Sequence, residues 1–224
     1  EGAALCYRTI CTEGAALLGP YAHPEVSVHT PSFALYADCL EREDEQGVAE
    51  LMLDSAEKLA AIGADFLICP DNTIHLAFSR VESKSPLPWL HIAEVVANEA
   101  LARDYRLLGI TGTKWLIESS VYPDALRKRG LEFLRPRDEE RDEISRIIME
   151  ELVNGEFLPD SIRYLQLVIA AMQEAGCDAV VLGCTELPLV LHDANSPLPV
   201  LDSTRLLARA ALRRAVGDRK VGTN

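Results

Sequence analysis

Short apolar runs alternate with longer amphipathic segments along this 224-residue chain. The runs at 65–69, 106–111 and 178–182 are rich in Leu, Ile and Val and are flanked by turn residues, which is typical of buried strands. The segments 47–62 and 204–216 carry apolar residues at helical spacing and predict helices that cover those strands. This alternation indicates an α/β fold built on mainly parallel sheets.

The remaining segments complete the same pattern. Further helices are predicted at 1–18, 93–102, 115–129, 137–153 and 159–175, and further strands at 26–28, 87–91, 132–134 and 197–201. The elements divide into two similar lobes, 1–93 with 204–224 and 94–203. Because ligands bind beyond the carboxyl ends of the strands in such folds, we expect the active site between the lobes.

Two stretches repeat one pattern at a strand end. In each, an acidic residue and an apolar run lead to a turn with Pro or Gly, and an ionisable side chain then precedes Thr by one or two positions. The stretch 64–75 presents Asp71, and the stretch 177–186 presents Cys184. We expect both groups to face one ligand, an arrangement typical of proton transfer. Asp71 can also serve as the cap of the following helix.

Cys184 has two interpretations. A cysteine in a strand is usually a packing residue. Its place after the strand, at a predicted helix N-terminus, instead favours the thiolate and a functional role. Glu186 can orient Cys184 or simply favour the start of that helix.

Three threonines follow strand ends, namely Thr73, Thr113 and Thr185. Hydroxyls and free N–H groups at helix starts can bind an anion without Lys or Arg, so a substrate carboxylate is the expected guest. Each threonine alone can equally be an ordinary cap. His29 can line the same site, and His75 can either do so or pack in the core.

The composition excludes several classes of partner. A net charge of −13 makes the chain a poor partner for nucleic acid or an anionic membrane, and its apolar runs stay well below the roughly 18 residues of a membrane helix. The six cysteines form no C-x-x-C pair, which indicates a reduced, cytoplasmic protein. The five histidines form no close pair, so no metal is expected, and no signal peptide is visible.

Several motifs resemble the aspartate/glutamate racemase superfamily of cofactor-independent amino-acid racemases. They are Gly183-Cys184-Thr185-Glu186, Pro88–Ile92, Leu108–Thr113, Ser119–Tyr122 and Pro199–Ser203. The similarity covers nearly the whole chain. The family's Cys-Asn-Thr turn corresponds here to Asp71-Asn72-Thr73, so Asp stands in place of the first catalytic cysteine. The family also has a strand before the first helix, and the chain is expected to start just after it.

The resemblance implies two pseudo-symmetric lobes, a homodimer, no cofactor and a small carboxylate as substrate. One acid/base takes the α-proton and the other returns a proton to the opposite face. Asn72 and the threonines would hold the carboxylate. Asp71 needs a pKa well above its ordinary value of about 3.9 to work in both directions. Positions that bind the side-chain carboxylate in dicarboxylate-specific members correspond to 30–33 and Leu167, and neither supplies a cation.

Three functional hypotheses follow. The leading one is a racemase or epimerase of an amino acid or related acid, with Asp71 and Cys184 as opposed acid/bases. The second is a decarboxylase or isomerase that uses Cys184 alone. The third is a ligand-binding protein that has lost its chemistry along with the first cysteine.

Overall fold

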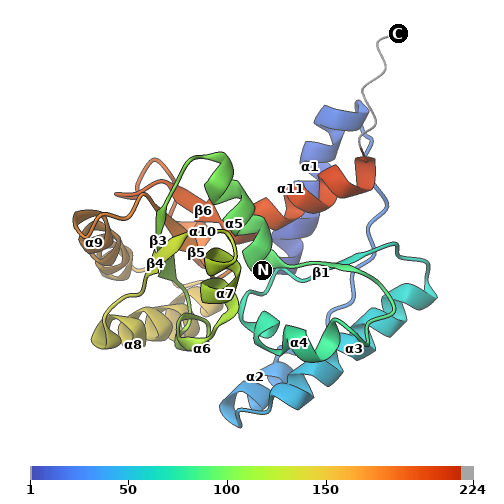
Figure 1. The fold of residues 1–224 in the computed structure, drawn as a ribbon, viewed down its shortest axis with the longest axis horizontal. Coiled ribbons are helices and arrows are strands. Elements are labelled where there is room, and N and C mark those ends of the chain that lie inside the picture. The colour runs from blue at the N-terminus through green and yellow to red at the C-terminus, as the bar shows by residue number, and fades with distance from the viewer. Residues whose placement is uncertain (1, 218–224) are drawn as a thin grey trace.

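The computed structural model describes residues 2–217 and contains two parallel sheets in that range (Figure 1). The larger sheet has the order β4-β3-β5-β6, formed by β3 (Leu107–Thr111), β4 (Glu132–Leu134), β5 (Ala179–Leu182) and β6 (Val200–Asp202). The smaller sheet pairs β1 (Leu67–Ile68) with β2 (Trp89–Leu90). In the larger sheet Val181 lies opposite Ile110 on one side and Leu201 on the other, which fixes the register of β3, β5 and β6.

Helices surround both sheets. They are α1 (Gly2–Leu18), α2 (Phe33–Glu41), α3 (Glu45–Ala61), α4 (Phe78–Val81), α5 (Ile92–Ala102), α6 (Lys114–Glu118), α7 (Val121–Arg127), α8 (Asp138–Arg146), α9 (Pro159–Glu174), α10 (Leu187–Val190) and α11 (Ser203–Val216). Short 3-10 turns at Thr73–Ala77 and Leu152–Asn154 and a π-helical turn at Ile147–Glu151 complete the set. No helix within residues 2–217 is long and apolar enough to cross a membrane.

Strand β5 shows why the larger sheet is buried on both faces. Val181 belongs to the core that α5, α7 and α11 form on one face, whereas Val180 belongs to the core of α8, α9 and α10 on the other. Successive side chains of a strand point to opposite faces, so a strand covered on both sides must be apolar throughout. Strand β5, Ala179–Leu182, meets that condition, and the α/β fold with parallel sheets is confirmed.

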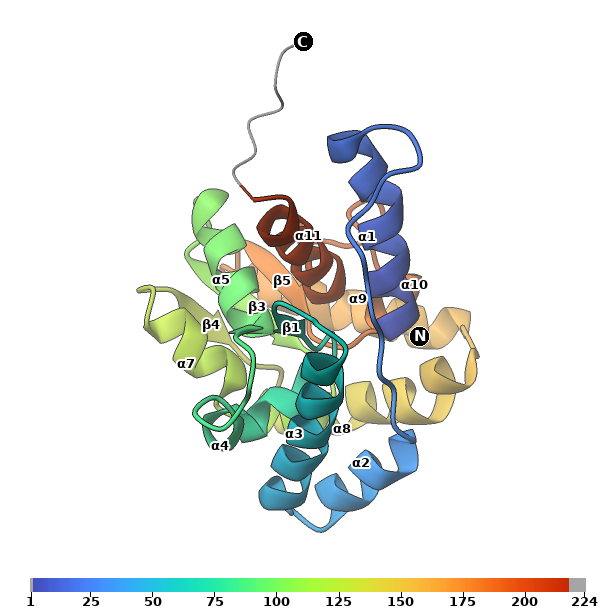
Figure 2. The same ribbon diagram turned by 90° about the vertical axis from the view of Figure 1, so that its right-hand side faces the viewer.

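The smaller sheet lies beside two groups of helices. Helices α2, α3 and α4 share a core that includes Tyr36, Met52 and Val81. Helix α1 packs along α11, as Figures 1 and 2 show, and their shared core includes Phe66 and Ile68 beside β1. This arrangement brings the carboxyl end of β1 toward the ends of β3 and β5.

Three local predictions were wrong. No strand forms at 26–28, because a strand needs a hydrogen-bonded neighbour and this segment has none among the described residues. The helix predicted at 115–129 is two helices, since the Ser119 hydroxyl bonds the carbonyl of Leu116 and ends α6. The long helix at 137–153 keeps α-geometry only to Arg146. The division of the chain at 93 and 203 stays a prediction, and its parts at Glu1 and 218–224 lie outside the described residues.

Candidate active site

Asp71 follows β1 through the turn Cys69-Pro70 and precedes the 3-10 turn that starts at Thr73. Its Oδ1 accepts hydrogen bonds from the N–H of Ile74 at 2.8 Å and from the hydroxyl of Tyr36 at 3.2 Å. The first bond confirms that Asp71 acts as a cap. Among residues 2–217, no hydrogen bond involves its Oδ2, so capping leaves one carboxylate oxygen available for chemistry.

Cys184 follows β5 after a single glycine. Its Sγ donates to Oε2 of Glu186 at 2.9 Å, and the hydroxyl of Thr185 donates to the same oxygen at 2.7 Å. A Cβ at Gly183 would lie 2.5 Å from the main-chain oxygen of Thr111, so only glycine lets the turn approach β3 this closely. The buried carboxylate of Glu186 thus joins the side chains of Cys184 and Thr185 within the second strand-end motif.

The two motifs lie within electrostatic range of each other. Burial is the main cause that raises the pKa of Asp71, and the charge of Glu186 from the other motif raises it further. Burial likewise raises the pKa of Cys184 well above its ordinary value, followed by the charge of Glu186 and, more weakly, that of Asp71. The pKa of Asp71 is thus shifted in the direction that two-way proton transfer requires, and burial is the main cause.

The prediction of a stabilised thiolate at Cys184 was wrong. Helix α10 has only four residues and begins at Leu187, so it offers little dipole to the thiol. The nearest charged group is instead the carboxylate of Glu186, which accepts the thiol proton and opposes its loss. Burial and this carboxylate therefore favour the thiol form of Cys184 over the thiolate.

Two of the three predicted threonines meet. The hydroxyls of Thr73, at the end of β1, and Thr113, at the end of β3, lie 3.3 Å apart and are both buried. They come from different sheets, so their contact joins the carboxyl ends of the two sheets. Thr185 instead turns toward Glu186. Their predicted role in holding a carboxylate stays a prediction.

Asn72 is 2% exposed and ties the first motif to the rest of the molecule. Its Nδ2 donates to the hydroxyl of Ser203 at 3.0 Å, and its Oδ1 accepts from the hydroxyl of Tyr122 at 2.7 Å. The Ser203 hydroxyl in turn donates to the carbonyl of Leu182, the last residue of β5. Asn72 therefore connects the two strand ends, and direct contact with a ligand stays a prediction.

The two candidate histidines differ. His29 lies half-buried with its Nδ1 3.0 Å from the Ser55 hydroxyl of α3, and none of the contacts described for 2–217 joins it to Asp71 or Cys184. His75 is buried, and burial with the neighbouring His91 ring lowers its pKa to about 3. Its Nδ1 donates to the main-chain oxygen of Asp71 at 2.9 Å. It is a neutral residue that holds the Asp71 turn.

Acidic groups dominate the site. Within the described part of the chain, no Lys or Arg forms a hydrogen bond or ion pair with Asp71, Cys184 or Glu186. The same residues contain no group of three or more His, Cys, Asp or Glu side chains that could hold a metal ion. The described polar contacts of Asp71, Cys184 and Glu186 are thus made by hydroxyls, a thiol and backbone N–H groups.

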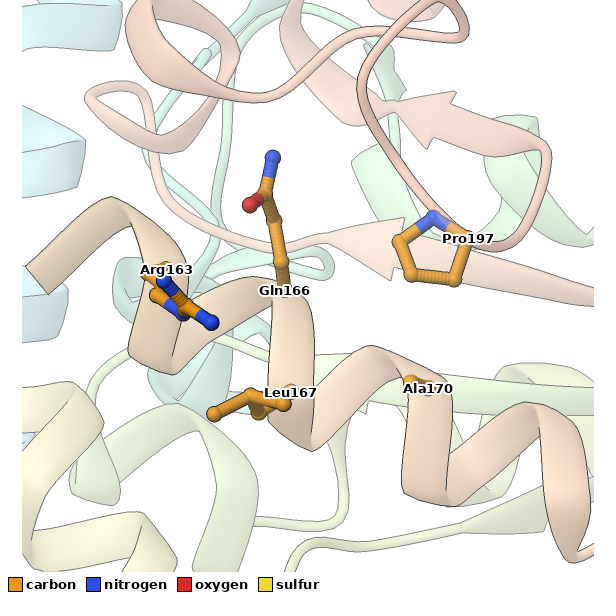
Figure 3. A pocket seen from close by; sticks show the side chains of 5 residues that line it. All are labelled: Arg163, Gln166, Leu167, Ala170 and Pro197. Atoms are coloured by element: carbon orange, nitrogen blue, oxygen red, sulfur yellow. The ribbon is translucent and has the colours of Figure 1, made fainter. Parts of the chain in front are cut away.

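Two cavities lie at residues outside both motifs. One of about 450 Å³ lies along α9 (Figure 3) and is lined by Arg163, Gln166, Leu167, Ala170 and Pro197. Leu167 is 61% exposed there, so the lack of a cation at this position says little about the Asp71 site. The charges near the site are given instead by the contacts of Asp71, Cys184 and Glu186.

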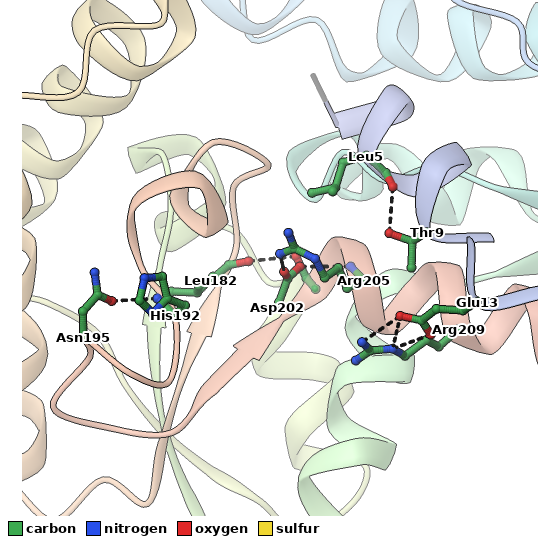
Figure 4. A network of polar contacts seen from close by, with 10 residues as sticks. Leu5, Thr9, Glu13, Leu182, His192, Asn195, Asp202, Arg205 and Arg209 are labelled. Atoms are coloured by element: carbon green, nitrogen blue, oxygen red, sulfur yellow. Dashed lines mark hydrogen bonds and ion pairs between the residues drawn. The ribbon is translucent and has the colours of Figure 1, made fainter. Parts of the chain in front are cut away.

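The second cavity, of about 200 Å³, borders α11 and contains three arginines. Each arginine pairs with a carboxylate: Arg103 with Glu99, Arg205 with Asp202, and Arg209 with Glu13. Figure 4 shows the last two pairs, of which the Arg209 pair joins α11 to α1. These pairs stabilise the frame behind the site.

Sequence reasoning did not find Tyr36, whose hydroxyl contacts Asp71. It lies on α2, which the pattern of the chain did not reveal. The spacing of Tyr36 and Leu40, both buried, is the signal that could have indicated a helix here.

The fold and the site together define an α/β protein with paired acid/base groups at the ends of parallel strands. The family model for Asp/Glu/Hydantoin racemase matches residues 2–211, and the chain belongs to this family. Its homologues are amino-acid racemases. The chain is 25% identical over 193 residues to the broad specificity amino-acid racemase RacX of Bacillus subtilis, covering 85% of this chain and 81% of RacX.

Solved structures are similar over nearly the whole chain. A candidate Asp/Glu racemase from Yersinia pestis has a TM-score of 0.89 and 28% identity, covering 96% of this chain and 94% of that one. An aspartate racemase homologue from Pyrococcus horikoshii has a TM-score of 0.83 and 28% identity, with the same coverage. The fold is therefore that of the family throughout.

Proposed function

We propose that this protein is a cofactor-independent racemase of amino acids with uncharged side chains, in which Asp71 and Cys184 act as opposed acid and base. The observation that carries the proposal is the meeting of the two strand ends: Asn72, next to Asp71, bonds the Ser203 hydroxyl, which bonds the carbonyl of Leu182, two residues before Cys184. Membership of a racemase family supports the reaction class.

In the proposed reaction the two groups work from opposite faces of the substrate. Oδ2 of Asp71 takes the α-proton from one face of the substrate, while the thiol of Cys184 gives its proton to the other face. In the reverse direction the thiolate takes the proton and the carboxylic acid of Asp71 returns one. A raised pKa brings the carboxyl group of Asp71 closer to working pH, where it can act in both directions.

The developing negative charge on the substrate needs donors. Buried hydroxyls and N–H groups act strongly on such a charge, because little water is present to weaken them. The hydroxyl pair of Thr73 and Thr113 is our candidate for this role. Glu186 holds the thiol until transfer, and Thr185 shares its carboxylate.

The charges support a substrate class. The site contains the acids Asp71, Cys184 and Glu186 and no described cationic partner, so a second carboxylate on the substrate would add repulsion. The ammonium group of an amino acid would supply the missing positive charge. Aspartate and glutamate are accordingly expected to be poor substrates, and the broad specificity of RacX is consistent with amino acids of other kinds.

Incubation of both enantiomers of a panel of amino acids in D2O tests the proposal. Racemisation with α-deuterium in the product supports it, most strongly for neutral side chains. A complete lack of exchange across the panel would reject it. Loss of CO2 from a substituted malonate with one product enantiomer would instead support the alternative in which Cys184 alone protonates a carbanion.

A further inference from the structure

We propose that Tyr36 is a positioning residue for Asp71, which leaves Oδ2 as the oxygen that exchanges protons with the substrate. This inference rests on the proposed function for its meaning in catalysis. The contact itself is independent of that function. Tyr36 lies on α2, 35 positions before Asp71 and outside both strand-end motifs.

The two hydrogen bonds described for the Asp71 carboxylate are on one oxygen. The N–H of Ile74 and the hydroxyl of Tyr36 both donate to Oδ1, at 2.8 and 3.2 Å. Two donors on one oxygen fix the rotation of the carboxyl group and stabilise negative charge on that side. A proton then resides on Oδ2, for which the described residues offer no partner.

The phenol is well suited to remain a donor. Its ring is buried in the core of α2 and α3, and Phe33 packs its ring against it with centroids 5.9 Å apart at 74°. Burial and the adjacent charge of Asp71 raise the pKa of Tyr36, so the hydroxyl keeps its proton through the working range. The ring position is set by packing, and the hydroxyl position follows from it.

Tyr36 also limits how far the pKa of Asp71 rises. Burial raises this pKa, whereas the bonds from Ile74 and Tyr36 lower it by stabilising the carboxylate. The hydrogen bonds therefore offset part of the rise that burial causes in the pKa of Asp71. Because the N–H of Ile74 belongs to the backbone, Tyr36 is the donor that a substitution can remove.

The variant Tyr36→Phe removes the hydroxyl and keeps the ring in place. We expect the titration midpoint of Asp71 to move up by about one to two pH units, the usual effect of losing a hydrogen bond to a charged group. Carbon-13 NMR of the aspartate carboxyl groups measures the midpoint directly, with Asp71→Asn to assign the signal. Under the proposed function, the acidic limb of kcat/KM moves upward by the same amount.

Tyr122→Phe is the matched control, since it removes a buried phenol whose acceptor is the neighbouring Asn72. It should leave the midpoint of Asp71 in place, even where it lowers stability or activity. An unchanged midpoint in Tyr36→Phe, or an equal shift in Tyr122→Phe, overturns the inference. A shifted midpoint in a protein that racemises nothing supports the role of Tyr36 and rejects the proposed function.

Discussion

The change Glu186→Gln tests the electrostatics of the second motif. The carboxylate of Glu186 accepts the Cys184 thiol proton at 2.9 Å and helps raise the pKa of that thiol. A neutral amide of the same shape removes the charge that opposes thiolate formation. A hydrogen bond involving a charged group is worth about 1.5–3 kcal/mol, which corresponds to about 1–2 pKa units. The pKa of Cys184 should therefore fall by at least about one unit.

The assay is the pH dependence of alkylation at Cys184. Iodoacetamide reacts with the thiolate, and cleavage before Asp178 places Cys177 and Cys184 on different peptides, so that mass spectrometry follows Cys184 separately from the other five cysteines. In Glu186→Gln the midpoint of the reaction should move to lower pH. Cys177, which is buried just before β5 and has its pKa raised to about 11 by burial, serves as the internal control. An unchanged or higher midpoint at Cys184 would refute the reasoning.

Two predictions concern stability. Asn72→Ala removes two buried hydrogen bonds and leaves the Tyr122 hydroxyl without its acceptor, so it should lower the free energy of unfolding by about 2–4 kcal/mol, whereas Asn98→Ala, which removes an exposed contact, should cost under about 1 kcal/mol. Urea unfolding of both variants measures the difference, and equal effects would contradict it. His75 has its pKa lowered to about 3, so the stability it contributes is present above about pH 6.5 and is lost as pH falls toward 3. Because of His75, the free energy of unfolding should fall over this window by on the order of 4 kcal/mol. In His75→Gln the free energy of unfolding should depend less steeply on pH. An equally steep dependence in the variant would contradict the role given to His75.

The motif strands could be read from the sequence because their positions obey a simple physical rule. A strand buried on both faces must be apolar throughout, and its carboxyl end in a parallel sheet leads to the ligand site. This rule located Asp71 and Cys184. It also explains why Thr73 and Thr113, which follow two different strands, meet in the fold.

The rest depended on contacts that local patterns do not encode. The segment 26–28 alternates like a strand, but pairing needs a neighbour at hydrogen-bonding distance, and none is described there. Tyr36 reaches Asp71 from a nine-residue helix whose apolar pattern is too short to stand out. The pKa of Cys184 was misjudged because the direction of the Glu186 side chain is set by the fold of the turn.

The most direct test of the account follows the α-proton of each enantiomer separately in D2O. With Cys184→Ala, Asp71 should still exchange the α-proton of one enantiomer, with retention and without racemisation. With Asp71→Asn, exchange should be confined to the opposite enantiomer, again with retention. If both variants exchange the same enantiomer, or if either one still racemises at the rate of the unaltered protein, then Asp71 and Cys184 are not opposed acid/bases on one substrate.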